Sequence, residues 1–486
     1  MLESSKVKWF YAICAAFIVL LGFALIFEHF EFLLLPAVLL IVYLAIFKLD
    51  TLYLFLLAMV APSVNIPDIG VGFGLTLPTD PILAGMLLLF LFKIIYNNEL
   101  NKEVMLHPIS IMLYIQLAWV FITSLTSTMP GVSIKYLTAQ LWYITSFYFI
   151  ATHVFFNFKN INRFFWLNIL PFAVIIGYTL VNHAKHHFDQ ESGNWVMKPF
   201  YNDHTSYGAA LAMFLPFLLA KTFEFNLKNT LIKPLIFMVL LYFIAATIFS
   251  YTRAAWLSLA FGMVVYIILK FKIRWTVIAA GILTLIITAL VFQNDISNYF
   301  AKNKQNSSTD INQHVKSISN VSSDASNKER INRWKSGYAM FLERPVFGWG
   351  PGTYSFNYGR FQKERDKTII STNSGDMGNA HSEYIGPLSE GGLPAMLIVF
   401  ALFGTILITG VRVYKKSENK FFKTYSMVCI IGLVTYMIHG FLNNFLDTDK
   451  ITAPFYGMTG ILIVMDLYQK KKMPEQDLKS ELKKVL

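Results

Sequence analysis

Long, uninterrupted apolar runs constrain this chain more than any other feature. Three of them cover residues 9–27, 234–250 and 275–292, and each approaches the roughly twenty residues that an α-helix needs to cross about 30 Å of hydrocarbon. Hydrophobic residues make up 55% of the 486 and charged residues only 14%, which is more apolar surface than one soluble core can bury. The sequence therefore predicts an all-α integral membrane protein, a polytopic bundle of about fourteen transmembrane helices.

Basic residues between the apolar runs predict the orientation of this bundle. Short connections rich in Lys and Arg stay in the cytoplasm. Such residues occupy alternate connections: Lys6 and Lys8, Lys48, Lys93 with Lys102, Lys159 with Arg163, Lys221 to Lys233, Lys270 to Arg274, and Arg412 to Lys423. The tail after Tyr468 is also basic, so both termini are expected in the cytoplasm, and the first run, which lacks a small-residue cleavage site, is expected to be retained. The net charge of +12 thus reports topology, and no nucleic-acid partner is expected.

The same alternation divides the chain into four parts. We expect an N-terminal bundle of about eleven helices at 1–293, a large periplasmic loop with amphipathic helices at 294–383, about three further helices at 384–468, and a basic cytoplasmic tail at 469–486. Within the loop, residues 306–327 are rich in Ser, Asn and Asp and lack apolar periodicity, which predicts a mobile stretch.

The second half of the loop has a different character. Arg330, Trp334, Tyr338 and Phe341 recur at helical spacing, which predicts an amphipathic helix at the membrane surface that Pro345 ends. A turn-rich segment follows, in which the backbone can approach a partner closely because three glycines alternate with other residues: Gly348, Gly350 and Gly352.

Charged residues near the outer ends of the spans are candidates for chemistry, because such groups are costly at a bilayer edge. Arg253 has no acidic neighbour in the sequence and is either a snorkelling interfacial residue or a fixed cation for a phosphate group. Arg330 shares a helical stripe with Trp334, which favours a directed role. For Arg333, one turn away, the pattern by itself indicates a solvated face.

Histidines offer a second set of candidates. His381 lies where the loop re-enters the membrane, with Glu383 and Glu390 close enough in sequence to tune it, although a lone His is more often structural. His153 and His439 lie inside spans and are interpreted as hydrogen-bonding groups that face the bundle. The spacing of the His, Asp and Glu residues in 185–204 fits no zinc pattern, so a polar rim is favoured over a metal site.

Other classes of site lack support in the sequence. Cys14 and Cys429 both sit in predicted spans, so no disulfide framework is expected. The chain has no Gly-rich phosphate loop, Ser-His-Asp pattern or paired-carboxylate motif, which leaves nucleotide hydrolysis and metal-dependent sugar-nucleotide transfer unsupported.

Four sequence pieces, in this order, resemble the O-antigen ligase and polymerase family of bacterial membrane glycosyltransferases. They are FYNDH at 200–204, SYTRAAW at 250–256, the Arg-x-x-x-Trp helix at 330–334 with RPVFGWGPG at 344–352, and AHSEY at 380–384 with EGGLP at 390–394. Two details depart from the family, which often has Asn-Pro-Asn where this chain has Asn202-Asp203-His204, and Asn where it has Ser382. The remaining spans match only as generic hydrophobic helices.

The resemblance implies a GT-C-like membrane fold that acts on undecaprenyl-diphosphate-linked glycans in the bacterial inner membrane, with no cofactor and no required metal. Arg253 and Arg330 would bind the diphosphate, and His381 would position or deprotonate the acceptor hydroxyl, so that transfer inverts the anomeric centre. Secondary substrate-binding roles would fall to six further residues: Arg333, Asn202, His204, Glu383, Tyr384 and Trp334.

Alternatives remain open at this level. The acceptor could be a lipid A core, which makes the protein a ligase, or another lipid-linked repeat, which makes it a polymerase; we favour the ligase. A polysaccharide transporter or flippase without covalent chemistry is the alternative from another class, but transporters tend to carry charged residues near mid-membrane rather than at one interface.

Overall fold

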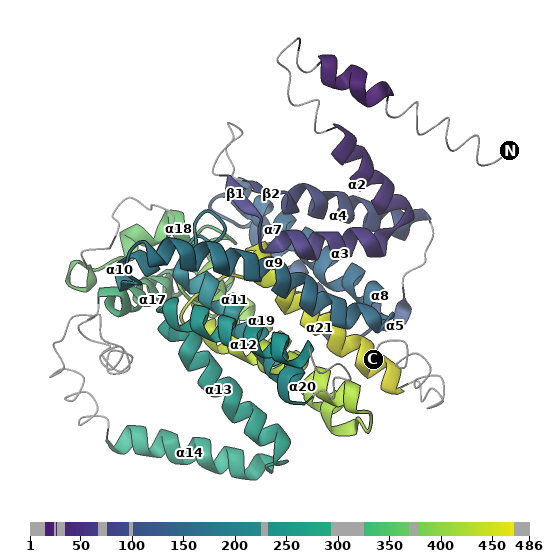
Figure 1. Ribbon diagram of the computed structural model, residues 1–486. Helices are drawn as coiled ribbons and strands as arrows, with labels where there is room; N and C mark the ends of the chain where they lie inside the picture. Colours follow the sequence, from purple (N-terminus) through teal and green to yellow (C-terminus); the bar gives the residue numbers. More distant parts are fainter. Residues whose placement is uncertain are drawn as a thin grey trace.

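The computed structural model of the chain describes residues 15–23, 26, 35–66, 75–96, 101–224, 232–292, 325–368, 371 and 378–470. In these ranges the protein is built of helices, apart from one small antiparallel sheet (Figure 1). Most of the predicted mobile stretch at 306–327, much of the first apolar run at 9–27 and the tail from residue 471 lie outside the described residues.

Eight helices in the described part are long and apolar enough to cross a bilayer. They are α6 (Pro108–Leu125), α9 (Lys159–Ala184), α11 (His204–Phe223), α12 (Ile232–Phe249), α13 (Arg253–Lys270), α19 (Ile385–Lys416), α20 (Lys420–His439) and α21 (Asp449–Lys470). These eight helices confirm the prediction of an all-α membrane protein for the described part of the chain. The total of about fourteen spans and the periplasmic position of the large loop stay predictions.

The remaining elements complete the described part of the chain. Ahead of α9 they are α2 (Leu35–Phe47), α3 (Leu49–Val60), β1 (Val64–Ile66), β2 (Leu75–Leu77), α4 (Thr79–Tyr96), α5 (Lys102–Met105), α7 (Pro130–Ile144), the π-helix η2 (Thr145–Ile150) and α8 (Ala151–Phe155). After α9 they are α10 (Gln190–Gly193), α14 (Trp275–Val291), α17 (Ala325–Glu343), α18 (Tyr354–Asn357) and the 3-10 turns η3 (Tyr358–Phe361) and η4 (Glu364–Asp366). The two strands pair Val64 with Leu77.

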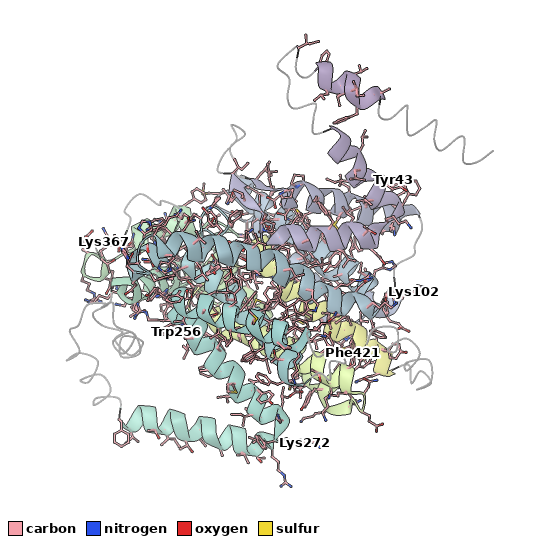
Figure 2. All side chains as sticks on the ribbon, in the orientation of Figure 1. Tyr43, Lys102, Trp256, Lys272, Lys367 and Phe421 are labelled. Atoms are coloured by element: carbon pink, nitrogen blue, oxygen red, sulfur yellow. The ribbon has the colours of Figure 1, made fainter. Side chains whose placement is uncertain are left out.

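Three helices, α11, α20 and α21, form the centre of the bundle, because nearly all of their side chains are buried. Their contacts are aromatic and close: the Phe165 ring of α9 stacks on Phe217 of α11 with centroids 4.3 Å apart. Side chains fill the spaces between the ribbons throughout this region (Figure 2). Lipid tails are as apolar as these side chains, so close packing rather than a hydrophobic force holds the helices together.

The start of α21 is anchored to the end of α3 by buried charges. Asp449 Oδ2 accepts hydrogen bonds from Ser63 Oγ and Thr79 Oγ1, both at 2.7 Å. Lys450 Nζ donates to the carbonyl oxygen of Val60 at 2.6 Å and to that of Ser63 at 2.7 Å. Because every charge finds a polar partner, this end of α21 is held in a fixed position.

The segments that carry the candidate residues meet at one end of the bundle. There the Thr252 hydroxyl, ahead of α13, donates to the carbonyl oxygen of His204 in α11 at 2.6 Å. The N–H of Glu383, ahead of α19, donates to the carbonyl oxygen of Gly440, after α20, at 2.8 Å. Lys367, beside η4, marks this end in Figure 2, and Lys102 in α5 marks the opposite one.

Candidate active site

The glycine-rich turn after α17 interlocks with a kink in α19. Gly392 adopts φ 71° inside α19, and a Cβ there would lie 2.2 Å from the carbonyl oxygen of Val346. Gly348 adopts φ 65°, and a Cβ there would lie 2.4 Å from the carbonyl oxygen of Glu390. Only glycine permits both conformations at this distance. The expected close approach is confirmed, and its partner is the Glu-Gly-Gly segment of α19.

Hydrogen bonds reinforce this interlock. The N–H of Leu393 donates to the carbonyl oxygen of Pro345 at 2.9 Å, and that of Gly350 donates to the carbonyl oxygen of Glu390 at 2.8 Å. The Glu390 carboxylate accepts from the N–H of Tyr354 at 2.9 Å. The glycine-rich turn and the Glu-Gly-Gly segment therefore fix α17 against α19. The carboxylate of Glu390 takes part in this interlock through Tyr354.

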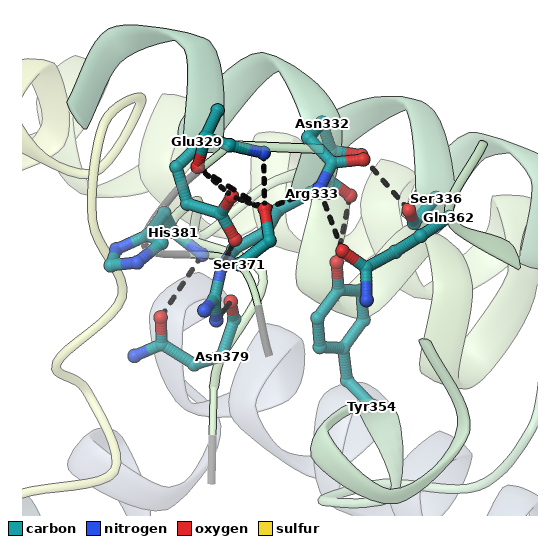
Figure 3. Close-up of polar contacts among 10 residues, drawn as sticks. Glu329, Asn332, Arg333, Ser336, Tyr354, Gln362, Ser371, Asn379 and His381 are labelled. Atoms are coloured by element: carbon teal, nitrogen blue, oxygen red, sulfur yellow. Dashed lines mark hydrogen bonds and ion pairs between the residues drawn. The ribbon is translucent and has the colours of Figure 1, made fainter. Parts of the chain in front are cut away.

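Arg333 lies inside a network between α17 and the end of the loop (Figure 3). Its side chain is only 8% exposed, so the interpretation as a solvated face is wrong. Arg333 Nε donates to Glu329 Oε1 at 2.9 Å, and NH1 donates to the carbonyl oxygen of Asn379 at 3.0 Å. The guanidinium also lies 5.1 Å from the centre of the Tyr358 ring. These contacts indicate that Arg333 holds the end of the loop against α17. Its predicted contact with the substrate stays a prediction.

Glu329 completes this network as an ionised group. Burial favours the neutral acid, but hydrogen bonds from Ser371, Arg333 and Thr368 outweigh burial and lower the pKa of Glu329 below its ordinary value. The ionised Glu329 and Arg333 thus connect α17 to Thr368 and Asn379, later in the loop.

Arg330 points to a different place from Arg333. Its Nε donates to the carbonyl oxygen of Leu442 at 3.3 Å, and its NH1 donates to Asn327 Oδ1 at the same distance. Arg330 interacts electrostatically with His204, His381 and His439. The three histidines come from three separate segments, so Arg330 sits where these segments converge.

Arg253 reaches the same place from the turn between α12 and α13. Tyr251 has φ 50° in this turn, and its hydroxyl donates to the carbonyl oxygen of Phe188 at 2.7 Å. The hydrogen bond from Thr252 to His204 docks the turn onto the start of α11. Arg253 opens α13 and interacts electrostatically with His204, as does Arg330. The structure therefore brings both predicted diphosphate-binding arginines within electrostatic range of His204.

Asp203 is the N-cap residue of α11. Its Oδ1 accepts from the N–H of Ser206 and from the Thr205 hydroxyl, both at 2.8 Å. These hydrogen bonds outweigh burial and lower the pKa of Asp203, so the N-cap carboxylate is charged beside His204. The neighbouring Asn202 is exposed, and its predicted binding role stays a prediction.

His381 lies just ahead of α19 in a left-handed backbone conformation, with φ 48°. Its N–H donates to Asn379 Oδ1 at 3.1 Å, and its carbonyl oxygen accepts from Trp334 Nε1 at 3.3 Å. Burial and then the charges of Arg330 and Arg333 lower the pKa of His381 to about 4. The imidazole is therefore neutral at physiological pH and has a lone pair for a proton.

Glu383 and Tyr384 hold together the segments that surround the site. Glu383 Oε1 accepts from the N–H groups of Phe445 at 2.7 Å and Leu446 at 2.9 Å, and from the Tyr436 hydroxyl. The Tyr384 hydroxyl donates to a backbone carbonyl at 2.9 Å, and its ring packs among other aromatic rings. Both sets of contacts join the entry of α19 to the connection between α20 and α21, and the substrate contacts predicted for these two residues stay predictions.

Two residues of the site were not recognised from the sequence. His439 is buried and faces the bundle as predicted, but it also lies within electrostatic range of Arg330, Asp203 and His204. Asn443 Nδ2 lies 3.1 Å from His439 Nε2. The four-residue spacing of His439 and Asn443 at the outer end of a span was the available signal. His153, by contrast, is exposed, so its interpretation as bundle-facing is wrong.

Across the described residues, no group of three or more His, Cys, Asp or Glu side chains is placed to hold a metal ion. The site holds the cations of Arg253 and Arg330 and the neutral imidazole of His381. Two fixed cations can neutralise an anion such as a diphosphate, and a neutral imidazole can accept a proton, which together suit transfer from an anionic leaving group.

A family model described as O-antigen ligase matches residues 237–400. This match covers less than half of the chain, and it supports an assignment to the O-antigen ligase family. The matched range runs from α12 into α19 and includes Arg253, Arg330 and His381, whereas His204 and His439 lie outside it. No curated protein matches the chain. The family and the apolar helices together support a multi-pass membrane enzyme of the glycosyltransferase type that acts on lipid-linked glycans.

Proposed function

We propose that this O-antigen ligase family member transfers a glycan from undecaprenyl diphosphate to a hydroxyl group of an acceptor, with lipid A core as the acceptor. The convergence of Arg253 and Arg330 on His204, with a neutral His381 beside Arg330, carries this proposal. The reaction takes place at the periplasmic face of the bacterial inner membrane, and both termini of the chain are cytoplasmic.

The chemistry requires one proton transfer and one displacement. The His381 imidazole accepts the proton of the acceptor hydroxyl as its oxygen attacks the anomeric carbon. The bond between that carbon and the diphosphate oxygen breaks, and the electron pair leaves with the diphosphate. Direct displacement of this kind inverts the anomeric centre.

The two arginines act on the leaving group. A guanidinium contacts phosphate oxygens through two parallel hydrogen bonds, and its charge is independent of pH in this range. Because negative charge grows on the diphosphate as the bond breaks, Arg253 and Arg330 stabilise the transition state more than the bound substrate. No metal ion is required for this step.

Transfer by the purified protein in liposomes tests the proposal. With a carrier-linked glycan and lipid A core present, glycan should appear on lipid A core, and His381→Ala and Arg253→Ala should each lower transfer at least a hundredfold. Transfer that persists in both variants, in protein that inserts normally, contradicts the enzymatic proposal and leaves the transporter or flippase alternative. Longer carrier-linked chains in place of the ligated product support polymerisation, since both reactions use the same donor.

A further inference from the structure

Two arginines lie against one tryptophan in the part of the loop that follows α17. The guanidinium carbon of Arg344 lies 4.4 Å from the centre of the Trp349 ring, and that of Arg360, in η3, lies 4.1 Å from it. At both distances a cation is attracted to an aromatic ring. Because both carbons are this close to one centre, the two positive charges are no farther apart than the sum of the two distances. We call Arg344 and Arg360 the arginine pair.

Trp349 is held in place by hydrogen bonds to three different segments. Its ring N–H donates to the carbonyl oxygen of Met340 at 2.9 Å, and its main-chain N–H donates to that of Ser389 at 3.1 Å. Its own carbonyl oxygen accepts from the N–H of Thr128 at 3.0 Å. Trp349 is also buried, at 5% exposed. A fixed ring limits where the two guanidinium groups lie, so the arginine pair is preorganised for a ligand.

The arginine pair lacks a counter-ion among the residues that the structure describes. Other cations of this part of the chain are paired with carboxylates: Arg333 with Glu329, Lys335 and Arg365 with Asp366, and Lys367 with Glu364. The side chains of Arg344 and Arg360 form no ion pair or hydrogen bond with any described residue, Glu343 included, and both are exposed. Two like charges at this separation repel one another, and an anion bound to both relieves the repulsion.

The surroundings of Arg344 are those of a site for a lipid. Phe347 stacks on Trp119 of α6, with ring centres 5.9 Å apart, and α6 is one of the eight helices long enough to cross a bilayer. Val346 and Phe347 are both exposed, in the same turn as Arg344. A tryptophan on a span and exposed apolar residues beside an arginine are typical of the bilayer edge, where lipid phosphates lie.

We infer that Arg344 and Arg360 bind the phosphate group of the acceptor glycolipid. A phosphate monoester carries a charge of about −1.5 to −2 near neutral pH, which matches two guanidinium groups better than one carboxylate does. Each guanidinium forms two parallel hydrogen bonds to phosphate oxygens. The identity of the lipid rests on the proposed function, in which lipid A core, a phosphorylated glycolipid, is the acceptor. The binding of phosphate does not depend on transfer.

This phosphate site is separate from the one proposed for the donor. Arg330 lies near the start of α17 and Arg344 just after its end, so the rise of an α-helix separates them by roughly 20 Å. The arginine pair therefore anchors the acceptor away from the bond that breaks. Its loss should raise KM for the acceptor and leave kcat unchanged, because such an anchor binds the ground state and the transition state equally.

Binding of lipid to the full-length protein tests the inference without catalysis. In native mass spectrometry, the wild type should bind lipid A core at least tenfold more tightly than lipid A core whose phosphates have been removed by a phosphatase. Arg344→Gln with Arg360→Gln should abolish this difference. Replacement of both by Lys should retain part of it, because lysine keeps the charge but not the parallel hydrogen bonds. In the liposome transfer assay, the Gln double variant should raise KM for lipid A core at least tenfold.

Lys335→Gln with Arg365→Gln is the matched control. It also removes two positive charges from exposed side chains of this loop, but these two already pair with Asp366. The preference for phosphorylated lipid A core and the KM should both stay within twofold of wild type. An equal loss in the control would show that only the total charge of the loop matters, and would overturn a specific site.

Other results also overturn the inference. One is equal binding of the phosphorylated and dephosphorylated lipid by the wild type, and another is a preference that persists in the Gln double variant. Phosphatidic acid carries a phosphate monoester on a lipid without sugars, and its binding should be the same in the wild type and the Gln double variant. If that variant loses phosphatidic acid as well, the arginine pair binds membrane phospholipid and the assignment to the acceptor fails.

The inference and the proposed function fail in different ways. If the wild type forms no product on lipid A core but still binds its phosphate through the arginine pair, transfer to this acceptor is refuted and the phosphate site stands. If transfer proceeds and the Gln double variant has a normal KM, only the phosphate site is refuted.

Discussion

The indole Nε1 of Trp334 donates a hydrogen bond to the carbonyl oxygen of His381 across 3.3 Å. This contact ties the amphipathic helix α17 to the proposed base, which lies 47 positions later in the chain. His381, which accepts this hydrogen bond, has a backbone φ of 48°, a conformation that costs on the order of 1 kcal/mol for a residue other than glycine. The helix thus helps to hold His381 in a conformation that the chain alone would avoid.

Trp334→Phe should lower kcat about three- to tenfold, because it keeps the ring but removes the N–H that holds His381, and one hydrogen bond contributes about 1 kcal/mol. The measurement is the steady-state rate of glycan transfer. Trp195→Phe, at a tryptophan that is 44% exposed and has no contact with His381, serves as the control. Equal rates for the two variants would show that the contact does not position His381.

Much of this arrangement could be predicted from the sequence because it depends on local pattern. Helical spacing located the helix that carries Arg330, and the structure has it as Ala325–Glu343. The alternating glycines predicted a close backbone approach, which occurs at Gly348. Apolar length predicted the membrane helices that the described residues contain.

The remainder depends on tertiary contacts that no local pattern encodes. Arg333 lies one turn from Arg330, yet its NH1 donates to Asn379, which is 46 positions away, so only the folded loop decides that it is buried. Glu383 holds the connection between α20 and α21 from 62 positions earlier in the chain, so only the folded chain places that connection beside the entry of α19. His153 is exposed, and the sequence could not show which face of its helix meets the bundle.

Arg253→Lys should lower transfer at least tenfold, which corresponds to about 1.4 kcal/mol in the transition state. Lysine keeps the positive charge but cannot form two parallel hydrogen bonds to phosphate oxygens. The loss should appear in kcat, since the charge on the leaving group grows as the bond breaks. Arg274→Lys, ahead of α14, is the matched control. Near-normal transfer by Arg253→Lys refutes a bidentate phosphate contact.

Gly392→Ala should destabilise the protein by more than about 2 kcal/mol, because the new Cβ would meet the Val346 carbonyl oxygen and the φ of 71° is unfavourable for alanine. Thermal unfolding in detergent micelles measures the effect. Gly404→Ala, a helical glycine of α19 with nothing within 4 Å of a new Cβ, should be neutral or slightly stabilising. Equal stability in the two variants contradicts the interlock between α17 and α19.

Glu329→Gln should cost about 3 kcal/mol, because it leaves the buried Arg333 cation without its carboxylate. The pKa of Glu329 is lowered in the folded protein, so its contribution is present above the pKa of the unfolded chain and is lost as the pH falls through the folded pKa. Unfolding of the single and double variants at pH 7 provides the measurement. Glu329→Gln with Arg333→Gln should be less destabilised than the sum of the two, and simple additivity would rule out the ion pair as the cause.

Glu383 should make the fold less stable at higher pH. Burial raises the pKa of Glu383 to about 7 even though the Tyr436 hydroxyl and two backbone N–H groups favour its ionised form. The folded state therefore holds a proton that the unfolded chain, at its ordinary pKa of 4.5, releases earlier, so the free energy of unfolding falls as the pH rises from about 4.5 to about 7, by on the order of 3 kcal/mol. Glu383→Gln keeps an oxygen for the N–H groups of Phe445 and Leu446 and should remove this dependence, as measured by denaturation in detergent at pH 5 and pH 8. Glu364→Gln, at a carboxylate that is 88% exposed, should leave the dependence unchanged. The same pH dependence in wild type and Glu383→Gln would mean that Glu383 is ionised throughout and that its three hydrogen bonds outweigh burial.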